Sequence, residues 1–444
     1  MGAAHENDRA RVFHSWSAQG ALDPTVIAGA LGSKFWDLNG NEWVDFSSML
    51  VNTNLGHQHP KMIQAIKDQA DTLCTVAPPF ANDQRSEAAR LIVEKANLGR
   101  DGAQRADGHF EKVFFTNAGA EAVENAVRLA KGVTGRMKVL STYRSYHGGT
   151  ALTVGLTGEA RRIENDPSVP GLVKFWGPYP YRSSFHSDAP EQETERALTH
   201  LRDTVVAEGA TKVAAIVLET VVGTNGILVP PPGYLEGVRA LCDEFGIIWI
   251  ADEVMAGFGR TGQWFAWQNW DAEPDLICFA KGVNSGYVPL GGVVISSEIA
   301  HHYDDRVFPG GLTYSGHPLA CASAVASIAI FEEEDVNGNA RRLGNDIIGP
   351  ALNDMAERHA SVGEVRGLGV FWALELVADP ATREPAPAAA VAGVVAECKA
   401  HGMWPMMAAN RIHVVPPCNT PDDLVREGLA VLDAALAIAD AAVA

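Results

Sequence analysis

Short runs of apolar residues alternate with longer segments of helical periodicity through the middle of the chain. The apolar runs lie at 113–115, 139–140, 213–218, 247–251, 276–280 and 292–295, and the helical segments at 120–132, 190–208 and 233–245. Unbroken apolar runs are typical of strands that are covered on both faces of a mainly parallel sheet. The pattern therefore predicts an α/β fold with one large doubly wound domain over residues 70–325.

The two ends of the chain show a different pattern. Two extended segments, 35–38 and 43–46, flank a polar turn near the N-terminus and predict a β-hairpin. Helices are predicted at 60–73, 83–96, 318–334, 387–401 and 421–441, strands at 362–365, 369–377 and 412–415, and a surface loop at 380–387. We therefore expect the chain after the long apolar helix at 318–334 to be an α+β segment.

Length and charge narrow the classes of function. The chain has 444 residues, and 35 Lys and Arg stand against 54 Asp and Glu, which gives a net charge of −19. A surface this acidic repels phosphate backbones and anionic lipids, so we expect no nucleic acid and no membrane among the partners. No apolar run reaches the ~18 residues that a membrane-spanning helix needs.

The cysteines indicate a reducing environment. They are scattered along the chain, at Cys74, Cys242, Cys278, Cys321, Cys398 and Cys418. Because no C-x-x-C pair and no suitable histidine spacing accompanies them, we predict neither a metal site nor a disulfide framework. The first residues lack the apolar core of a signal peptide. The expected location is the cytoplasm.

The strand predicted at 247–251 ends on two adjacent carboxylates, Asp252 and Glu253. A carboxylate at the end of a buried strand needs a cationic partner, because an unpaired buried charge is costly. The partner of Asp252 is a metal, an arginine or a protonated ring nitrogen. An aspartate at such a place is as often a helix cap or a loop anchor.

The strand predicted at 276–280 is followed directly by Lys281. A lysine at the mouth of a buried strand is unusual in packing terms, because its ammonium group must be desolvated or must reach a crevice. Desolvation lowers the pKa of the amine, and a Schiff-base lysine requires this. Taken without its neighbours, a lysine at a strand end is more often solvated than catalytic.

The segment from Phe114 to Glu121 predicts a strand, a turn of small residues and the start of a helix. Small residues let an anion approach the free N–H groups of the first helical turn, where the helix dipole also favours negative charge. The segment therefore has the form of a phosphate site, although an ordinary strand-to-helix turn has the same form.

Residues 257–262 match the pattern G-x-G-x-x-G, which is typical of dinucleotide-binding folds. That motif needs its glycines directly between a strand and a helix. Here the strand ends near Asp252, and residues 263–267 are a poor helix start. We interpret the segment as a loop and not as a nicotinamide site.

Together these segments resemble the class III aminotransferases, which are pyridoxal-phosphate enzymes of fold type I. The resemblance runs from the hairpin at 43–46 to Pro416-Pro417. It is most specific in Asp252-Glu253-Val254, in the loop 257–262 and in Ala280-Lys281-Gly282. It implies a large domain with a mainly parallel, mixed sheet, and a smaller α+β domain formed jointly by residues 1–69 and 326–444.

The resemblance also implies catalytic roles at the cofactor pyridoxal 5′-phosphate. Lys281 would form the Schiff base and then move the proton of the substrate. Asp252 would pair with the pyridinium nitrogen. Glu219 matches the strand-end glutamate near the cofactor in the family, and Val254 and Tyr146 would pack on the two faces of the ring.

Further cofactor contacts are implied around the phosphate. Ala118, Gly119 and Ala120 form the turn whose backbone N–H groups would bind it, and His147 follows Tyr146 at the ring. Thr313 would reach the phosphate of the neighbouring subunit. The resemblance therefore implies a homodimer, or a dimer of dimers, with shared active sites and with no metal.

Departures from the family pattern bear on the substrate. Relatives specific for 4-aminobutyrate carry an arginine where Gly149 stands and a second glutamate where Thr224 stands, so that carboxylate grip is missing. Met406 occupies the usual place of a flexible arginine, which leaves Arg411 and Arg182 as candidates to bind a carboxylate. Val51 replaces a bulky aromatic residue beside the substrate.

The implied activity is ping-pong transfer of an amino group from a primary amine or ω-amino acid, such as taurine or β-alanine, to pyruvate or 2-oxoglutarate. Residues 13–19 and 54–60 resemble the taurine and ω-amino acid branch most. A racemase or aminomutase on the same scaffold is the alternative, and it would need no added oxo acid. A binding protein without catalysis is a weaker alternative, because every cofactor position is filled.

Overall fold

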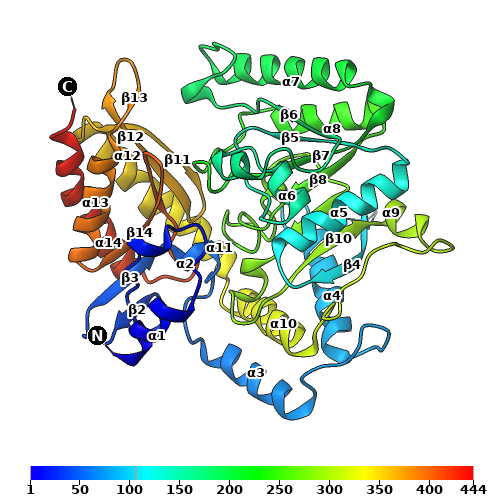
Figure 1. Cartoon of the computed structure of the whole chain (residues 1–444), viewed down its shortest axis with the longest axis horizontal. Helices are drawn as coiled ribbons and strands as arrows, with labels where there is room; N and C mark the ends of the chain where they lie inside the picture. The colour runs from blue at the N-terminus through cyan, green and yellow to red at the C-terminus, as the bar shows by residue number, and fades with distance from the viewer. Residues whose placement is uncertain (1, 106–107, 444) are drawn as a thin grey trace.

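Two β-sheets organise the chain, and they lie side by side with helices around each (Figure 1). The computed structural model describes residues 2–105 and 108–443. Within these ranges, one sheet has seven strands and the other has eight. The seven-stranded sheet is built from the middle of the chain, and the eight-stranded sheet draws on both ends.

The seven-stranded sheet has the strand order β4-β10-β9-β8-β7-β5-β6. Its strands are β4 Phe110–Thr116, β5 Lys138–Thr142, β6 Leu172–Phe175, β7 Val213–Glu219, β8 Ile248–Asp252, β9 Leu276–Phe279 and β10 Gly291–Ser296. All neighbouring pairs from β9 to β6 are parallel, whereas β10 is antiparallel to both β9 and β4. The sheet is therefore mixed and mainly parallel, as predicted.

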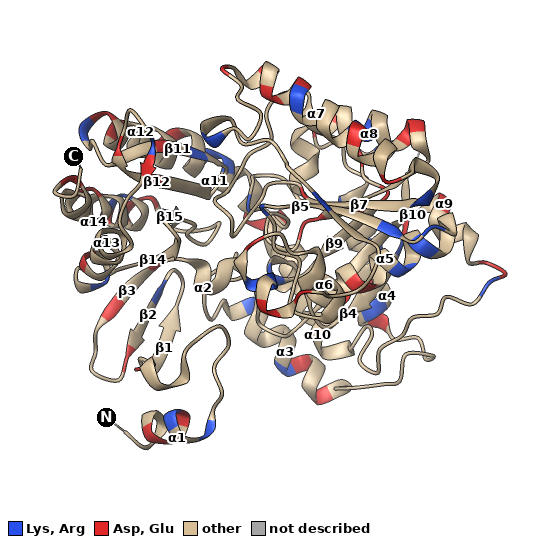
Figure 2. Cartoon of the chain, turned by 45° about the horizontal axis from the view of Figure 1, so that its top comes forward, with Lys and Arg blue, Asp and Glu red and all other residues tan. Residues whose placement is uncertain are grey.

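Helices cover both faces of this sheet. They are α4 Asp83–Ala96, α5 Gly119–Thr134, α6 Ala151–Leu156, α7 Pro190–Ala207, α8 Tyr234–Phe245, α9 Ser297–His302 and α10 Pro318–Glu333. Because side chains alternate along a strand, Leu276 and Cys278 pack with α5, while Ile277 and Phe279 pack with the cluster that contains α10. Charged residues lie on the outer helices, for example α7 and α8 (Figure 2).

The eight-stranded sheet has the order β1-β2-β3-β14-β15-β12-β11, with β13 paired to β12. Its strands are β1 Ile27–Leu31, β2 Lys34–Asp37, β3 Glu42–Phe46, β11 Val362–Leu368, β12 Phe371–Asp379, β13 Glu384–Pro385, β14 Met403–Ala408 and β15 Arg411–Val414. The parallel pairing of β3 with β14 joins the N-terminal hairpin to the C-terminal segment. The sheet thus needs both ends of the chain. The domain limits 1–69, 70–325 and 326–444 stay a prediction.

The remaining helices are α1 Ala3–Arg11, α2 Ser48–Val51, α3 Pro60–Thr72, α11 Val336–Arg342, α12 Gly349–Arg358, α13 Ala388–Ala400 and α14 Asp422–Asp440. A π-helical turn, Leu343–Ile348, links α11 to α12. The predicted hairpin and the predicted long helices are present within a few residues of their expected bounds. The segment at 380–387 differs, because it contains the short exposed strand β13 in place of a simple loop.

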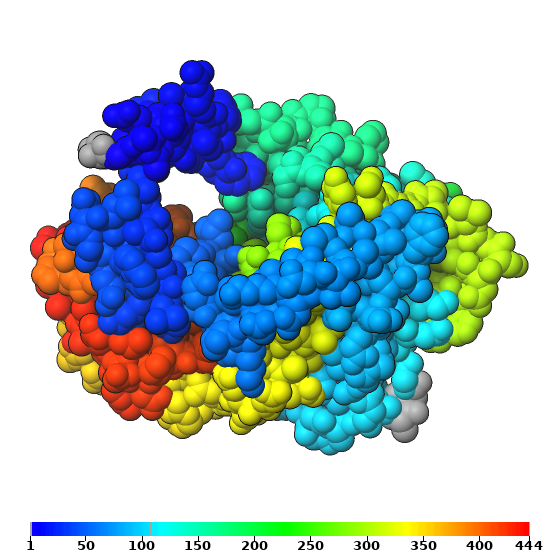
Figure 3. Space-filling model, turned by 90° about the horizontal axis from the view of Figure 1, so that it is seen from below, coloured from blue at the N-terminus to red at the C-terminus, as the bar shows by residue number. Residues whose placement is uncertain are grey.

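The N-terminal segment reaches across the molecule. In Figure 3 it stands as a dark blue arch that touches the green part of the chain, with an opening beneath it. Its Trp16 lies edge-on to Tyr146, with ring centroids 6.3 Å apart. The segment around Trp16 therefore lies against the loop that carries Tyr146.

Candidate active site

A cavity of about 200 Å³ lies at the carboxyl ends of β7 and β8. It is lined by Gly119, Ala120, Tyr146, His147, Gly148, Gly149, Glu219, Thr224, Asp252, Val254, Met255 and Lys281. Ligands of open α/β sheets bind in the crevice outside the carboxyl ends of the strands. The structure thus brings Lys281, Asp252, Glu219 and most of the predicted cofactor contacts into one cavity.

Asp252 ends β8 and is almost completely buried. Its Oδ2 lies 2.8 Å from Nδ1 of His147, and its Oδ1 accepts a hydrogen bond from the backbone N–H of Val254 at 3.1 Å. The other ring nitrogen of His147 has no hydrogen-bond partner among the described residues. These contacts fix the orientation of the Asp252 carboxylate. Because Asp252 also lines the cavity, its carboxylate offers a negative charge to a cationic group bound there.

Glu219 ends the neighbouring strand β7 and lines the same cavity. Its two carboxylate oxygens accept hydrogen bonds from the backbone N–H groups of Tyr146 and Gly223, each at 2.8 Å. Burial raises the pKa of Glu219 to about 7. Glu219 therefore holds two loops of the cavity wall in place and titrates near neutral pH.

Glu253 follows Asp252 but has a different environment. Its carboxylate accepts hydrogen bonds from the hydroxyl of Thr220 at 2.6 Å and from the backbone N–H groups of Ala266 and Trp267 at 2.7 and 2.9 Å. Glu253 is therefore a loop anchor. Of the two carboxylates at the end of this strand, only Asp252 reaches the cavity.

Lys281 begins a short 3₁₀ turn, Lys281–Asn284, directly after β9. Its φ of 46° lies in the left-handed region, which is rare for a residue with a long side chain. Burial lowers the pKa of the Lys281 amine, although the carboxylates of Asp252 and Glu219 act against this. A lowered pKa increases the fraction of neutral amine that can attack a carbonyl carbon.

The N-terminus of α5 closes one side of the cavity. Ala118 precedes the helix without a side-chain cap, so the N–H groups of the first turn are free of intrahelical partners. A Cβ on Gly119 would lie 2.7 Å from Cγ1 of Val254, so only glycine lets the helix start approach this side chain. The small residues predicted as a phosphate site thus have the required close approach.

Arg161 is a residue that the sequence reasoning missed. Its guanidinium carbon lies 3.9 Å from the centroid of the Tyr146 ring and 5.0 Å from that of Trp16. Arg161 donates through Nε to Glu159, while its buried Nη2 has no partner among the described residues. Its charge also contributes to lowering the pKa of Lys281. No spacing rule links Arg161 to Tyr146 along the chain.

The predicted substrate contacts lie outside the cavity lining. Arg182 donates through Nε to Glu375 and belongs to a buried ion cluster between the two sheets. Arg411 begins β15, and its Nε donates to the carbonyl of Ala408 at 3.0 Å. Within the described residues, no carboxylate lies within ion-pair distance of Arg411. It adjoins Gly226, in the same loop as Thr224, which does line the cavity.

Two further predicted residues also lie away from the cavity. Val51 is buried in an apolar cluster with Met255, which lines the cavity, so Val51 supports the wall without forming it. Thr313 is exposed between α9 and α10. That exposure is compatible with a contact to a neighbouring subunit, and the role of Thr313 stays a prediction.

The model of one protein family matches residues 17–436, and its description is Aminotransferase class-III. The chain belongs to the class III aminotransferases. In sequence it is 34% identical over 413 residues to a probable 4-aminobutyrate aminotransferase of Bacillus subtilis, which covers 91% of each chain. This class III aminotransferase is therefore a transaminase of the ω-amino acid and amine group, and its sheets match the fold type I structures of the family.

Two solved structures are similar over nearly the whole of this class III chain. One is the taurine:2-oxoglutarate aminotransferase of Bifidobacterium kashiwanohense, in complex with pyridoxal phosphate and glutamate, with 41% identity, 99% and 98% coverage and a TM-score of 0.94. The other is a pyridoxal-phosphate-bound amine transaminase of an uncultivated Pseudomonas species, with 32% identity, 96% and 98% coverage and a TM-score of 0.90.

Pyridoxal 5′-phosphate is the cofactor of this family, and the residues of the cavity fit it. The free N–H groups at Gly119 and Ala120 would hold its phosphate, Asp252 would face its ring nitrogen, and Lys281 would bind its aldehyde carbon. When bound, the cofactor supplies the carbonyl group that takes up the amino group and the ring that accepts electrons.

The described ranges, 2–105 and 108–443, contain neither a cluster of metal-ligating side chains nor a helix suited to a membrane. No three His, Cys, Asp or Glu side chains there are grouped so that they would hold a metal ion. No helix of the same ranges combines the length and the apolar character that crossing a membrane requires.

Proposed function

We propose that this enzyme transfers the amino group of a short ω-amino acid, taurine or β-alanine, to 2-oxoglutarate. Lys281 would hold the cofactor and move the substrate proton through its amine. Asp252 would keep the ring nitrogen protonated, and Glu219 would fix the loop that carries Tyr146. Arg411 would bind a carboxylate of the acceptor. The similarity to a taurine:2-oxoglutarate aminotransferase supports this choice of substrates.

The position of Arg161 carries the proposal. Its guanidinium lies against Tyr146, a residue of the cavity wall, and one of its nitrogens is buried without a partner. Arg161 is half-buried and pairs with Glu159, and a guanidinium with a further unpartnered nitrogen favours an additional anionic ligand. A short ω-amino acid carries an amine at one end and a sulfonate or carboxylate at the other. Arg161 would bind that acidic group while the amine points to Lys281.

The neighbouring positions distinguish this donor from 4-aminobutyrate. Gly149 and Thr224 line the cavity where relatives specific for 4-aminobutyrate carry an arginine and a glutamate. The chain therefore lacks that subgroup's carboxylate grip, and Arg161 supplies a cation from another element. We also propose that the enzyme is a cytoplasmic homodimer in which Thr313 reaches the active site of the partner.

Replacing Arg161 tests the donor. Arg161→Gln should raise the KM for taurine and β-alanine about 10- to 100-fold, because a hydrogen bond to a charged group contributes about 1.5–3 kcal/mol. Propylamine, which has no acidic group, should keep its KM. Steady-state kinetics with 2-oxoglutarate as acceptor, and with pyruvate as the second acceptor, gives these values.

Arg162→Gln is the matched control. Arg162 is the next residue and pairs with Asp166, and no contact joins it to the Tyr146 ring. Its replacement should leave both KM values unchanged. If the wild-type enzyme fails to consume taurine and β-alanine with either acceptor, the proposed substrates are wrong. Conversion of an amine without any added oxo acid would support the racemase or aminomutase alternative.

A further inference from the structure

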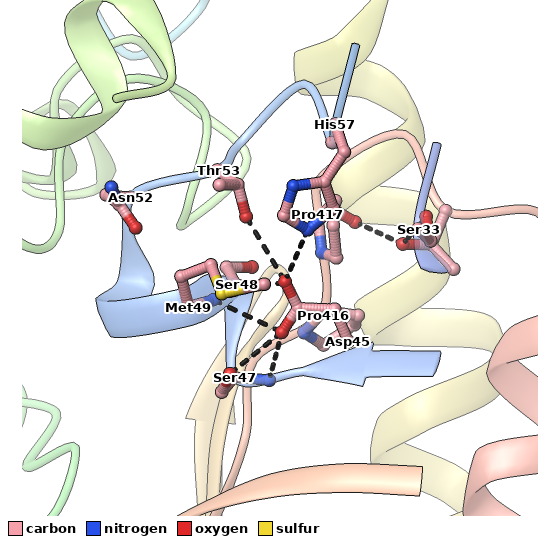
Figure 4. A network of polar contacts seen from close by, with 12 residues as sticks. Ser33, Asp45, Ser47, Ser48, Met49, Asn52, Thr53, His57, Pro416 and Pro417 are labelled. Carbon is pink, nitrogen blue, oxygen red and sulfur yellow. Dashed lines mark hydrogen bonds and ion pairs between the residues drawn. The ribbon is translucent and has the colours of Figure 1, made fainter. Parts of the chain in front are cut away.

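A fully buried carboxylate, Asp45, lies near the end of β3 and is not among the residues that line the cavity. Figure 4 shows the polar contacts around it. Its Oδ1 accepts from the backbone N–H of Ser47 at 3.1 Å and from the Ser47 hydroxyl at 2.8 Å. Its Oδ2 accepts from the backbone N–H of Met49 at 3.1 Å, from the Thr53 hydroxyl at 3.5 Å and from the His57 ring at 3.0 Å. One buried carboxylate thus organises the segment 47–57.

The segment that these bonds hold has an unfavourable backbone. Ser48, Met49 and Val51 have φ values of 43°, 59° and 56°. Residues with a side chain rarely adopt this region, and a β-branched valine is a strong exception. Such conformations persist only where the surroundings fix them, and they are concentrated at functional sites. The hydrogen bonds to Asp45 hold the segment 47–53 in this conformation.

A buried arginine holds the same segment from its other side. Arg260 lies in the loop 257–262, whose glycine pattern the cofactor site does not use. It is completely buried, and it donates to the Ser48 hydroxyl at 3.1 Å and to Oδ1 of Asn54 at 2.6 Å. The guanidinium also donates to the carbonyl of Pro416 at 2.5 Å, which ties the segment to the loop after β15.

The segment packs directly on the turn that carries Lys281. A Cβ on Gly286 would lie only 2.3 Å from Nδ2 of Asn52, and a Cβ on Gly282 would lie 2.3 Å from Nδ2 of Asn54. The two asparagine side chains therefore pack against these glycines. The backbone N–H of Leu55 donates to the Ser285 hydroxyl at 3.0 Å. The turn has positive φ values at Lys281, Ser285 and Gly286. Two strained segments therefore meet at three places.

We propose that Asp45 is a positioning residue for Lys281. Its carboxylate fixes the segment 47–53, and the adjoining residues 52–55 hold the turn 281–286 in the conformation that directs the lysine into the cavity. Asp45 does not touch the cavity, and it acts through Asn52, Asn54 and Leu55. The proposal concerns the lysine turn, and it holds for any amine substrate.

Asp45→Asn keeps the size of the side chain but places an NH₂ group against the donors. In the cofactor-free protein, hydrogen–deuterium exchange by mass spectrometry should show exchange in the peptide 281–286 at least about tenfold faster than in wild type. The peptide 291–296 of β10 serves as the internal reference and should be unchanged. The bound-cofactor absorbance band should also form more slowly after pyridoxal phosphate is added.

Asp37→Asn is the matched control. Asp37 is also buried, and its carboxylate accepts from the backbone N–H groups of Asn39 and Asn41 at 2.8 and 2.9 Å, but its turn does not contact residues 281–286. This variant should exchange at 281–286 like wild type. If Asp45→Asn lowers the melting temperature and leaves exchange at 281–286 unchanged, Asp45 is only structural and the proposal is wrong.

A second variant covers the case that Asp45→Asn does not fold. Asn52→Ala keeps every hydrogen bond of Asp45 and removes the amide that packs on Gly286, together with the bond that Asn52 Oδ1 accepts from the backbone N–H of Leu50 at 3.3 Å. It should accelerate exchange at 281–286 about threefold and lower kcat, with little change in the KM for the amine. Wild-type exchange at 281–286 in this variant would overturn the proposal, because the contact between the two segments would then have no effect.

Discussion

Two buried glutamates, Glu219 in the cavity wall and Glu375 between the sheets, ionise in opposite ways. Burial raises the pKa of Glu219 to about 7, and its hydrogen bonds come from two backbone N–H groups. Burial alone would also raise the pKa of Glu375. The charge of Arg366, together with hydrogen bonds from Tyr179 and Arg182, lowers it to about 2. Burial raises the pKa of both carboxylates, and only the cationic and hydrogen-bonding partners of Glu375 reverse that shift.

The opposite pKa shifts of Glu219 and Glu375 distinguish a cavity suited to proton transfer from an ion cluster that only stabilises the fold. Glu375 pairs with Arg182 and with Arg366, and Arg366 also donates to the carbonyl of Gly226 at 2.7 Å. In the cavity, burial lowers the pKa of Lys281 and raises the pKa of Glu219 to about 7, so both pKa values are shifted in the direction that favours the uncharged group. Groups with such perturbed pKa values are concentrated where proton transfer occurs.

The largest expected effect comes from removing the cavity lysine. Lys281→Ala should lower transamination by about 10⁴-fold or more and abolish the absorbance band of the bound cofactor, because no other lysine lines the described cavity. Stopped-flow and steady-state assays measure the rate, and absorbance spectra measure the band.

Lys174→Met is the control for Lys281→Ala, because it removes a second buried lysine with a lowered pKa that lies outside the cavity. Burial lowers the pKa of Lys174 to about 7, but its amine donates to the Ser141 hydroxyl at 2.8 Å and to the carbonyl of Gly155 at 2.7 Å, away from the cavity. The variant should keep its colour and its turnover. A colourless Lys174→Met protein, or a fully active Lys281→Ala protein, would contradict the assignment.

The next largest effect is on stability, at the joint between the sheets. Glu375→Gln should lower the free energy of unfolding by about 3–5 kcal/mol at pH 7, because it removes the buried carboxylate that pairs with both Arg182 and Arg366 and leaves only Glu364 to pair with Arg366. Urea denaturation measures this value. Glu384→Gln, on the exposed strand β13, should change it by less than about 0.5 kcal/mol.

The pH dependence at Glu375 has a definite sign. The folded-state pKa of about 2 lies below the ordinary value of 4.5. The stabilisation is therefore complete above pH 4.5 and is lost as the pH falls from 4.5 towards 2. A Glu375→Gln variant as stable as wild type at pH 7 would show that the charges of this cluster cancel without Glu375.

The central strands and their chemistry were readable in the sequence. β7, β8 and β9 are unbroken apolar runs that stop at Glu219, Asp252 and just before Lys281. Because parallel strands align their carboxyl ends, a charged residue at the end of each run predicts a common site. Membership of the family rests on the same segments. For these three strands, the residues that the sequence pattern marks as strand ends are the ones that the fold brings into the cavity.

Other features depend on the fold as a whole. Asp252 and Glu253 are adjacent, and only the packing of the loops decides that one lines the cavity and the other anchors residues 266–267. Arg161 reaches Tyr146 because the chain reverses after α6, and no periodicity marks that reversal. Strand β14 contains Pro405, which weakens any local strand pattern.

The smallest expected effect tests whether the pKa values of Glu219 and Glu375 are shifted in opposite directions. The folded-state pKa of Glu219 is about 7, against an ordinary value of 4.5. The folded protein therefore holds the proton more tightly than the unfolded chain, and stability falls as the pH rises through this window. Relative to Glu219→Gln, wild type should lose about 3 kcal/mol between pH 4 and pH 8, since one pKa unit is about 1.4 kcal/mol.

Glu253→Gln completes this test. Burial also raises the pKa of Glu253 to about 7, so wild type measured relative to Glu253→Gln should likewise lose stability as the pH rises, in urea denaturation. Only Glu219→Gln should also shift the pH dependence of kcat, because Glu219 lines the cavity and holds the Tyr146 loop, whereas Glu253 holds residues 266–267. Equal shifts of kcat in the two variants would mean that the titration of Glu219 acts through stability alone and that its place in the cavity wall has no part in the reaction.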